Sequence, residues 1–220
     1  MSSYCFIPGP FGGLRSITDY AGANVQRMGC AAVFRPNYSG PLKVLNYAYD
    51  FAKDFLQAQD ADDHTSLIAP DVAGASGPEP QSRKFDTFND EAHYIARCIR
   101  KWHQNGQLLN TITVIYGHHW QAETLQRALK AVDIPNAWLK STADKKAYDA
   151  NAESVALLTR QSSKGLEFDT VVLVGLGGLK DDEENLENEV RLLYVGMTRA
   201  RQQLLLTGNG ENWFVGRFGR

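Results

Sequence analysis

The chain has 220 residues, of which 43% are hydrophobic and 22% are charged, and its formal net charge is -2. These values are ordinary for a soluble globular protein of one domain or one and a half, and they exclude nucleic-acid binding through overall positive charge. Any nucleic-acid site must therefore be a local patch.

Cysteine usage and hydropathy indicate the compartment. Cys5, Cys30 and Cys98 are odd in number, scattered and without a Cys-x-x-Cys pair, which predicts reduced thiols and neither a disulfide framework nor a zinc site. No apolar run reaches the ~20 residues of a membrane helix, and the N-terminus lacks a signal-peptide pattern. We therefore expect a cytoplasmic protein with no membrane partner and no metal site.

The first part of the chain predicts little regular structure before one helix. Residues 1–13 are rich in proline and glycine, and residues 31–36 form a short strand candidate that ends at a proline. Residues 42–57 predict a helix, because apolar side chains recur at steps of three and four residues. The apolar face of that helix is predicted to consist of Leu42, Leu45, Tyr49, Ala52 and Leu56.

A polar stretch separates this helix from the next. Residues 60–84 predict a surface loop with a short strand at residues 66–69. Its acidic cluster with His64 could bind a metal or form a solvated turn, and the spacing matches no known metal-binding loop. Residues 85–88 predict a short strand, followed by a helix over residues 90–105 with Asn89 as its cap.

A strand, a helix and a short connection follow. Residues 111–116 predict the strand and residues 120–132 the helix, and residues 136–154 connect this unit to the next strand. His118 and His119 precede the helix, where a metal-binding role competes with capping or surface roles.

Two apolar runs, residues 155–159 and 170–175, frame the most informative stretch. Neither run alternates between apolar and polar side chains, which is typical of strands buried on both faces of a parallel sheet. Hydroxyl, amide and cationic side chains and Gly165 lie between the two runs. These groups suit an anion or a nucleic-acid backbone, and they equally suit an ordinary polar loop.

The last part of the chain predicts a helix, a strand and a tail. The helix begins within the acidic residues 180–188, residues 203–207 form the strand, and residues 209–220 form the tail. Arg199, near the end of the helix, is expected to be free to point into a cleft; the alternative is a cation placed at a helix C-terminus. The predicted apolar face of the helix is Leu186, Val190, Leu193 and Met197. Alternating strands and helices predict an α/β fold, a parallel sheet with helices on both faces.

Two long motifs carry a family resemblance. The stretch TRQSSKGLEFDTVVLVG, residues 159–175, resembles motif V of the superfamily 1 DNA helicases of the UvrD/Rep/PcrA type, and EVRLLYVGMTRAR, residues 189–201, resembles their motif VI. The resemblance implies the C-terminal motor domain of such a helicase, the second RecA-like (2A) domain. The short connection over residues 136–154 implies that the chain lacks the large 2B insertion that UvrD, Rep and PcrA carry there.

Two shorter segments resemble the same family. RSITDYAGA, residues 15–23, resembles a degenerate motif III, and FRPNYSGPLKVL resembles the beginning of the second motor domain. We therefore expect residues 1–30 to be a loose segment with a motif III remnant and residues 31–220 to be the helicase C-terminal domain. The positions that depart from the family pattern include Arg15, Thr18, Ala21, Ser39, Gly117 and Gln161. Ser39 stands where the family has an arginine that reaches the γ-phosphate, and a serine lacks that charge and reach.

The resemblance also implies roles for individual residues. Arg199 would be the catalytic residue, a mobile positive charge that contacts the nucleotide γ-phosphate. Glu167 would bind the nucleotide sugar and Tyr38 the base, and Gly165 belongs to the same cofactor-binding motif. Contacts to the phosphates of single-stranded DNA would come from Thr159, Gln161 and Ser162.

Two motifs that ATP hydrolysis requires are missing from the sequence. It has no G-x-x-x-x-G-K-[ST] loop and no Asp-Glu pair after a buried strand where Mg²⁺ would be held. We therefore expect ATP and Mg²⁺ to bind only together with a partner that supplies the N-terminal helicase domain, and the isolated chain to be inactive. Two alternatives stay open: a decayed or truncated helicase that binds nucleic acid or protein without catalysis, and a structural fragment without autonomous function.

Overall fold

The computed structural model describes residues 7–8, 14–15, 27–28, 31–32, 42–56 and 77–218. The chain divides into two compact units, Met1–Tyr38 and Ser39–Arg220. In the first unit, two pairs of short antiparallel strands are described: β1 (Ile7–Pro8) with β2 (Leu14–Arg15), and β3 (Arg27–Met28) with β4 (Ala31–Ala32).

Several predicted features lie outside the described residues. They are most of the motif III remnant, Tyr38, Ser39, the acidic cluster with His64 and the expected strand at residues 66–69.

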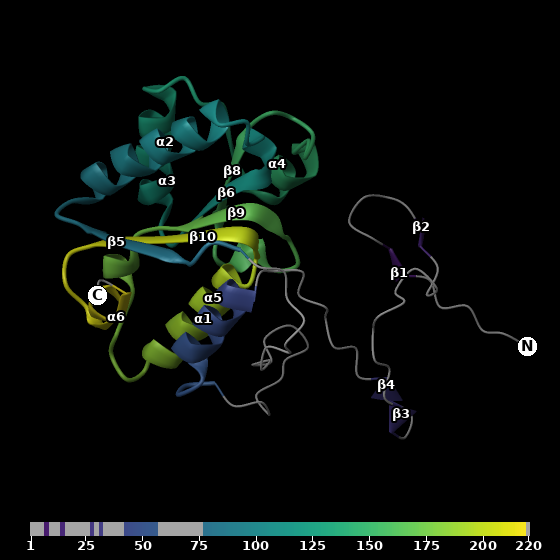
Figure 1. Ribbon diagram of the computed structural model, residues 1–220, viewed down its shortest axis with the longest axis vertical. Coiled ribbons are helices and arrows are strands. Elements are labelled where there is room, and N and C mark those ends of the chain that lie inside the picture. Colours follow the sequence, from purple (N-terminus) through teal and green to yellow (C-terminus); the bar gives the residue numbers. More distant parts are fainter. Residues whose placement is uncertain are drawn as a thin grey trace, which may run out of the picture. The chain divides into compact units, whose positions relative to one another are not determined.

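The second unit is built on one six-stranded sheet in which all neighbouring strands are parallel (Figure 1). Its strands, in spatial order, are β5 (Gln81–Phe85), β10 (Ala200–Asn209), β9 (Phe168–Leu173), β6 (Ile112–Tyr116), β8 (Val155–Thr159) and β7 (Asn136–Trp138). The central strand β6 is buried along its whole length, as expected for a strand covered on both faces.

Helices cover both faces of this sheet, as Figure 1 shows. One face carries α1 (Leu42–Ala52), α5 (Leu186–Met197) and α6 (Trp213–Phe218). The other face carries α2 (Phe88–Gln104) and α3 (His119–Lys130). The predicted α/β architecture, a RecA-like parallel sheet with helices on both faces, is confirmed.

Short elements complete the connections between the strands. They are α4 (Thr142–Ala147) and three 3₁₀ turns, η2 (Leu109–Thr111), η3 (Gln161–Ser163) and η4 (Leu176–Gly178). Within the part of the chain that the structure describes, none of the helices combines the length and apolar character needed to cross a bilayer.

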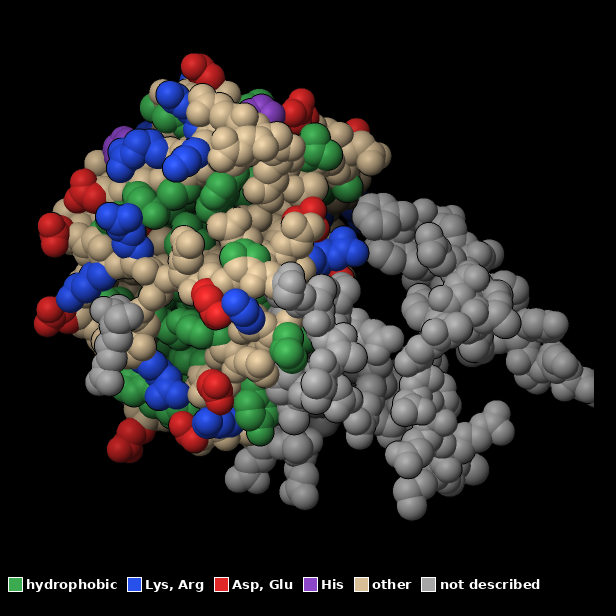
Figure 2. All heavy atoms as spheres, in the orientation of Figure 1, with side chains coloured by type: hydrophobic (Ala, Val, Ile, Leu, Met, Phe, Trp, Pro, Cys, Tyr) green, Lys and Arg blue, Asp and Glu red, His purple; other side chains and the backbone are tan. Residues whose placement is uncertain are grey.

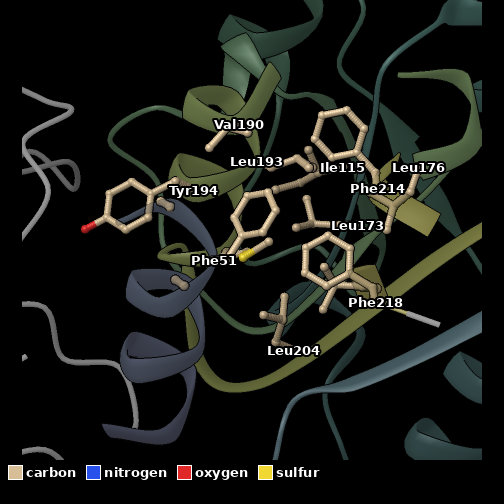
Figure 3. Close-up of a cluster of buried hydrophobic side chains, with 14 of the residues drawn as sticks. Phe51, Ile115, Leu173, Leu176, Val190, Leu193, Tyr194, Leu204, Phe214 and Phe218 are labelled. Carbon is tan, nitrogen blue, oxygen red and sulfur yellow. The ribbon is translucent and has the colours of Figure 1, made fainter. Parts of the chain in front are cut away.

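The hydrophobic core consists of two main clusters, one on each face of the sheet. In the cluster under α1, α5 and α6, the Phe51 side chain points between the side chains of α5 and α6 (Figure 3). Its ring centroid lies 4.8 Å from that of Phe218 and 6.5 Å from that of Phe214. Burial of a side chain of this kind stabilises a fold by about 1.5–3 kcal/mol, so Phe51 is a principal anchor of α1.

The predicted apolar face of α1 is partly wrong. Ala52 and Leu56 are buried as expected, but Leu42, Leu45 and Tyr49 are only half-buried. The side chains that the helix buries instead are Val44, Ala48 and Phe51. Both sets recur at helical spacing, and the large aromatic contacts that Phe51 makes with α6 select the second set.

The boundaries of β5 and α2 also differ from the prediction. β5 ends at Phe85 and α2 begins at Phe88, so the strand predicted over residues 85–88 is misplaced. Thr87, not Asn89, caps α2: its backbone is extended and its hydroxyl accepts a hydrogen bond from the Asp90 backbone N–H at 3.2 Å.

Three short elements were not expected from periodicity. β7 and α4 lie in the stretch predicted as a connection, and α6 lies in the predicted tail. By contrast, α5 begins at Leu186, within the acidic residues 180–188 where the helix start was predicted, after a turn at residues 183–185.

The two candidate faces of α1 can be separated by mutation. Phe51→Ala should lower the free energy of unfolding by about 3–5 kcal/mol in urea denaturation, because it leaves a cavity among aromatic rings. Tyr49→Ala, on the same helix, should cost less than about 1 kcal/mol. Equal losses for the two variants would contradict the observed orientation of α1.

Candidate nucleotide and nucleic-acid sites at the two edges of the sheet

Parallel register sorts the predicted site residues into two groups. We call the edge where the strands begin the amino edge and the edge where they end the carboxyl edge. Thr159, the last residue of β8, is paired with Tyr116, the last residue of β6. Ala200, the first residue of β10, is paired with Phe168, the first residue of β9. Segments that follow β6 and β8 therefore lie at the carboxyl edge, and those that precede β9 and β10 lie at the amino edge.

The carboxyl edge holds the residues that the family resemblance links to single-stranded DNA. The Thr159 hydroxyl donates to the Ser162 hydroxyl oxygen at 2.7 Å, and the Ser162 backbone N–H donates back to Thr159 Oγ1 at 3.2 Å. Lys145 Nζ, from α4, also donates to Ser162 Oγ at 2.8 Å. Gln161 is exposed beside them. The structure thus brings a hydroxyl pair, an amide and a lysine together.

Gly165 lies in the exposed loop between η3 and β9. Its φ of +78° is in the left-handed region that favours glycine, and no neighbour crowds its Cα. A side chain there would be strained by the backbone conformation and not by contacts. Leu166, the next residue, is an exposed apolar side chain of the same loop.

The backbones of Glu167 and Arg199 lie close together at the amino edge. The Phe168 backbone N–H donates to the Arg199 carbonyl at 3.0 Å, so the two residues flank one rung of the ladder between β9 and β10. The Glu167 carboxylate lies 3.5 Å from Arg201 Nε. The register of β10 shifts between Ala200 and Gln203, an irregularity of the kind that re-aims side chains next to functional sites.

The Arg199 side chain folds back onto the end of α5. Its Nε donates to the Val195 carbonyl at 3.0 Å, and Nη2 donates to Thr198 Oγ1 at 3.2 Å. The residue is only 8% exposed. The expectation that Arg199 is free to point into a cleft is therefore wrong for this conformation, because the carbonyls at the helix C-terminus attract the guanidinium.

A buried ion pair, missed from the sequence, links the two motif segments. Arg160, directly after β8, pairs with Glu189 of α5. Burial lowers the pKa of the Arg160 guanidinium, and the adjacent Glu189 opposes that effect. The guanidinium also fills the space where a side chain at Gly117 would lie. Arg160 thus holds the β8 loop against α5 and the end of β6.

Glu91, on the first turn of α2, was also missed. It is fully buried, and its Oε1 accepts hydrogen bonds from the Gly175 backbone N–H and the Thr207 hydroxyl, both at 2.7 Å. Its Oε2 is buried without a hydrogen-bond partner. Burial raises the Glu91 pKa to about 7, against the opposing effect of these two hydrogen bonds. A carboxyl group with a raised pKa joins α2, β9 and β10 at the carboxyl edge.

His118 and His119 are exposed at the start of α3, and His118 takes the N-cap position. The backbone N–H groups of Gly117 and His118 donate to Gln121 Oε1 at 3.0 and 2.9 Å, which completes the start of the helix. Among the described residues, no three His, Cys, Asp or Glu side chains are grouped to hold a metal ion.

Charges of both signs are interspersed on the face of the molecule drawn in Figure 2. This agrees with the small net charge of -2. An anionic ligand must therefore be recognised by local groups, as the sequence predicted.

Comparison with known sequences identifies a family for most of the chain. Residues 32–143 and 136–211 match the family described as the UvrD-like helicase C-terminal domain. The ATP-dependent DNA helicase Rep of Buchnera aphidicola subsp. Schizaphis graminum is 48% identical over 59 residues, which are 24% of this chain and 9% of that protein. The ATP-dependent DNA helicase PcrA of Leuconostoc citreum is 36% identical over 98 residues, which are 40% of this chain and 13% of that protein.

The matched segments span about a tenth of the length of these curated relatives. Among solved structures, the C-terminal domain of a possible DNA helicase from Lactobacillus plantarum superposes with a TM-score of 0.57. It is 19% identical, and the match covers 81% of this chain and 92% of that one. At this level of identity, the likeness shows that the fold is shared.

The buried ion pair predicts a strong coupling between its two residues. Arg160→Met should lower the free energy of unfolding by about 3 kcal/mol, because it leaves the largely buried Glu189 carboxylate without its partner. The double variant R160M/E189M should recover most of that loss, since it removes both charges. Additive losses in a double-mutant cycle, measured by urea denaturation, would show that the pair does not hold the two segments together.

Glu91 predicts a specific pH dependence of stability. The folded-state pKa is raised from 4.5 to about 7, so the stability that protonated Glu91 contributes is full below pH 4.5 and is lost as pH rises through 7. The free energy of unfolding of Glu91→Gln minus that of the wild type should therefore rise by roughly 3 kcal/mol between about pH 4.5 and 8. The exposed control Glu123→Gln should show no such rise. A constant difference for Glu91→Gln would contradict the raised pKa.

Proposed function

This chain belongs to the UvrD-like helicase C-terminal domain family, and on that premise we propose that it acts as the second motor domain of an ATP-dependent DNA helicase. In this proposal it contributes one wall of an ATP cleft and part of a path for single-stranded DNA. A first motor domain, supplied by a partner or by further sequence, provides the grip on the nucleotide phosphates.

The observation that carries the proposal is the division of polar groups between the two sheet edges. Glu167 and Arg199 flank one backbone hydrogen bond at the amino edge, whereas Thr159 and Ser162 form a hydroxyl pair at the carboxyl edge. A motor domain needs such a division. It must contact the nucleotide and the DNA strand at different places, and the two contacts must be coupled to each other. The pair formed by Arg160 and Glu189 connects the two segments mechanically.

At the amino edge, we assign Arg199 to the γ-phosphate and Glu167 to the nucleotide sugar. A triphosphate bound there would present the negative charge that a guanidinium stabilises during phosphoryl transfer. The backbones of the two residues lie next to each other across the β9–β10 pairing, which supports the assignment. Arg199 must, however, exchange its bond to the Val195 carbonyl for the ligand, so a rotation of its side chain accompanies engagement.

At the carboxyl edge, we assign Thr159, Gln161 and Ser162 to the phosphates of a single DNA strand. Hydroxyl and amide groups donate hydrogen bonds to phosphate oxygens without reading base sequence. Gln161 is exposed, and Ser162 is already bonded to Lys145, which adds a positive charge beside it. The relatives named Rep and PcrA are described as ATP-dependent DNA helicases, which supports DNA as the polymer.

A second candidate is a non-enzymatic module that binds nucleic acid or a protein. The burial of Arg199 against its own helix favours it, because a side chain held there does not reach outward. Gly117 also favours it, since the residue provides no cation at that position. In this candidate function, the nucleic-acid contacts at the carboxyl edge remain, and the nucleotide contacts at the amino edge are not made.

ATP turnover separates the two candidates. The isolated chain should show no DNA-stimulated ATP hydrolysis, because its sequence has no phosphate-binding loop. Fused in place of the C-terminal motor domain of a PcrA-type helicase, the chain should restore DNA-stimulated turnover. In that fusion, Arg199→Ala should reduce kcat at least about 10³-fold and leave single-strand affinity unchanged.

Arg100→Ala is the matched control in the same fusion, because it removes an exposed arginine from α2. Its turnover should equal that of the parent fusion. Turnover by the isolated chain would contradict the proposed function. Equal losses of turnover and DNA affinity in Arg199→Ala would contradict the assignment of Arg199 to the γ-phosphate. A fusion that binds DNA but never hydrolyses ATP would favour the non-enzymatic candidate.

A further inference from the structure

We propose that the carboxyl edge carries a base-stacking and phosphate-binding ledge that extends the single-strand path beyond Thr159, Gln161 and Ser162. We define the ledge as His119, Trp120, Trp138, Lys140 and Lys145. The inference rests on the proposed function, because it assigns further contacts to the same nucleic-acid site.

Register shows that these residues share one edge. Trp138, the last residue of β7, is paired with Leu157, and the Leu139 backbone N–H donates to the Leu157 carbonyl at 3.0 Å. Lys140 therefore lies level with Thr159, which is itself paired with Tyr116. His119 and Trp120 begin α3 just after β6 ends. The ledge thus spans three neighbouring strands, β6, β8 and β7.

Aromatic rings run along the ledge. His119 lies between Tyr116 and Trp138, with ring centroids 6.1 and 5.9 Å away. Trp138 Nε1 donates to the Tyr116 hydroxyl at 2.6 Å, which fixes the orientation of the indole. These contacts hold the rings in place before any ligand arrives, which lowers the entropic cost of binding.

Trp120 is the most exposed ring of the ledge. The residue is 52% exposed, although a tryptophan gains from burial, and it contacts Phe88 edge-to-face with centroids 4.8 Å apart. The contact supports one part of the indole and leaves the rest open to solvent. Every nucleobase has an aromatic face that can stack on such a ring, whereas the bases of a duplex are already stacked.

Two lysines place positive charge beside these rings. Lys140 Nζ lies 4.9 Å from the centre of the Trp138 ring, and Lys145 Nζ donates to Ser162 Oγ at 2.8 Å. Both lysines are exposed. Asp144 accepts hydrogen bonds from the backbone N–H and hydroxyl of Ser141, the N-cap of α4, and it lies near Lys140 and offsets part of that charge. Exposed rings with cations beside them suit an unpaired strand, with bases on the rings and phosphates at the lysines.

The test measures affinity of the pure chain for fluorescent oligo(dT) and for an abasic strand of equal length, over a range of salt. Trp120→Ala should weaken oligo(dT) binding about tenfold and leave abasic-strand binding unchanged, because the abasic strand has nothing to stack. Trp120→Tyr should retain most of the affinity for oligo(dT). The double variant K140A/K145A should weaken both ligands and reduce the slope of log affinity against log salt by about 1.4.

Matched controls come from residues near the amino edge of the sheet. Leu108→Ala removes another exposed apolar side chain, just before β6, and R100A/K101A removes two exposed cations from the end of α2. Neither variant should alter the affinity for oligo(dT) or for the abasic strand, or the slope of log affinity against log salt. Thermal unfolding midpoints of all variants, measured in parallel, identify any loss that comes from folding.

The outcomes separate this inference from the function on which it rests. If T159A/S162A weakens binding while Trp120→Ala and K140A/K145A do not, the ledge is refuted and the proposed site stands. If the wild-type chain binds no oligo(dT), both fail. An equal effect of Trp120→Ala on oligo(dT) and on the abasic strand would show that Trp120 does not stack on bases and would overturn the inference.

Discussion

The parallel pairing of β9 with β6 on one side and β10 on the other is the constraint that positions both candidate sites. Because every strand of the sheet runs in the same direction, each connection must cross from one edge to the other. The loop after β8 therefore begins at the carboxyl edge and reaches β9 at the amino edge. One stretch of eight residues, 160–167, carries side chains at both edges.

That loop is anchored by charge and not by apolar packing alone. Arg160 is buried against Glu189 at its start, while exposed Gly165 and Leu166 follow near its end. A buried ion pair adds little net stability compared with a well-packed apolar pair, but separating its two charges is costly, so the pair resists separation of the two segments. The pair therefore suits a segment that must transmit the position of α5 to the carboxyl edge. We regard the pair of Arg160 and Glu189 as the physical link between the two edges. Glu91 separately connects α2 to β10 and to the segment after β9 through its hydrogen bonds.

Sequence alone predicted the fold class because long periodic segments dominate it. The buried runs at residues 155–159 and 170–175 and the helices α2, α3 and α5 follow from hydrophobic pattern and occur close to where it placed them. The hydrophobic pattern gave wrong predictions where tertiary contacts determine the orientation or the presence of an element. Phe51 turns α1 by its contacts with α6, and α6 itself is too short to show a period. β7 and α4 were not predicted for the same reason, because they are also too short to show a period.

The site was predictable only as far as local motifs reach. The motif resemblance located Thr159, Ser162, Glu167 and Arg199 in the chain, but not the direction of the Arg199 side chain, which depends on carbonyls at the end of α5. Glu91 carries no local signal, because its partners lie 84 and 116 residues away. The most direct test of the division between edges is photo-crosslinking of the chain to a thiothymidine-substituted single strand, with the crosslinked peptides identified by mass spectrometry. Crosslinks are expected in residues 118–120, 138–145 and 159–164, and crosslinks concentrated in residues 166–168 and 199–202 would contradict the division between the two edges.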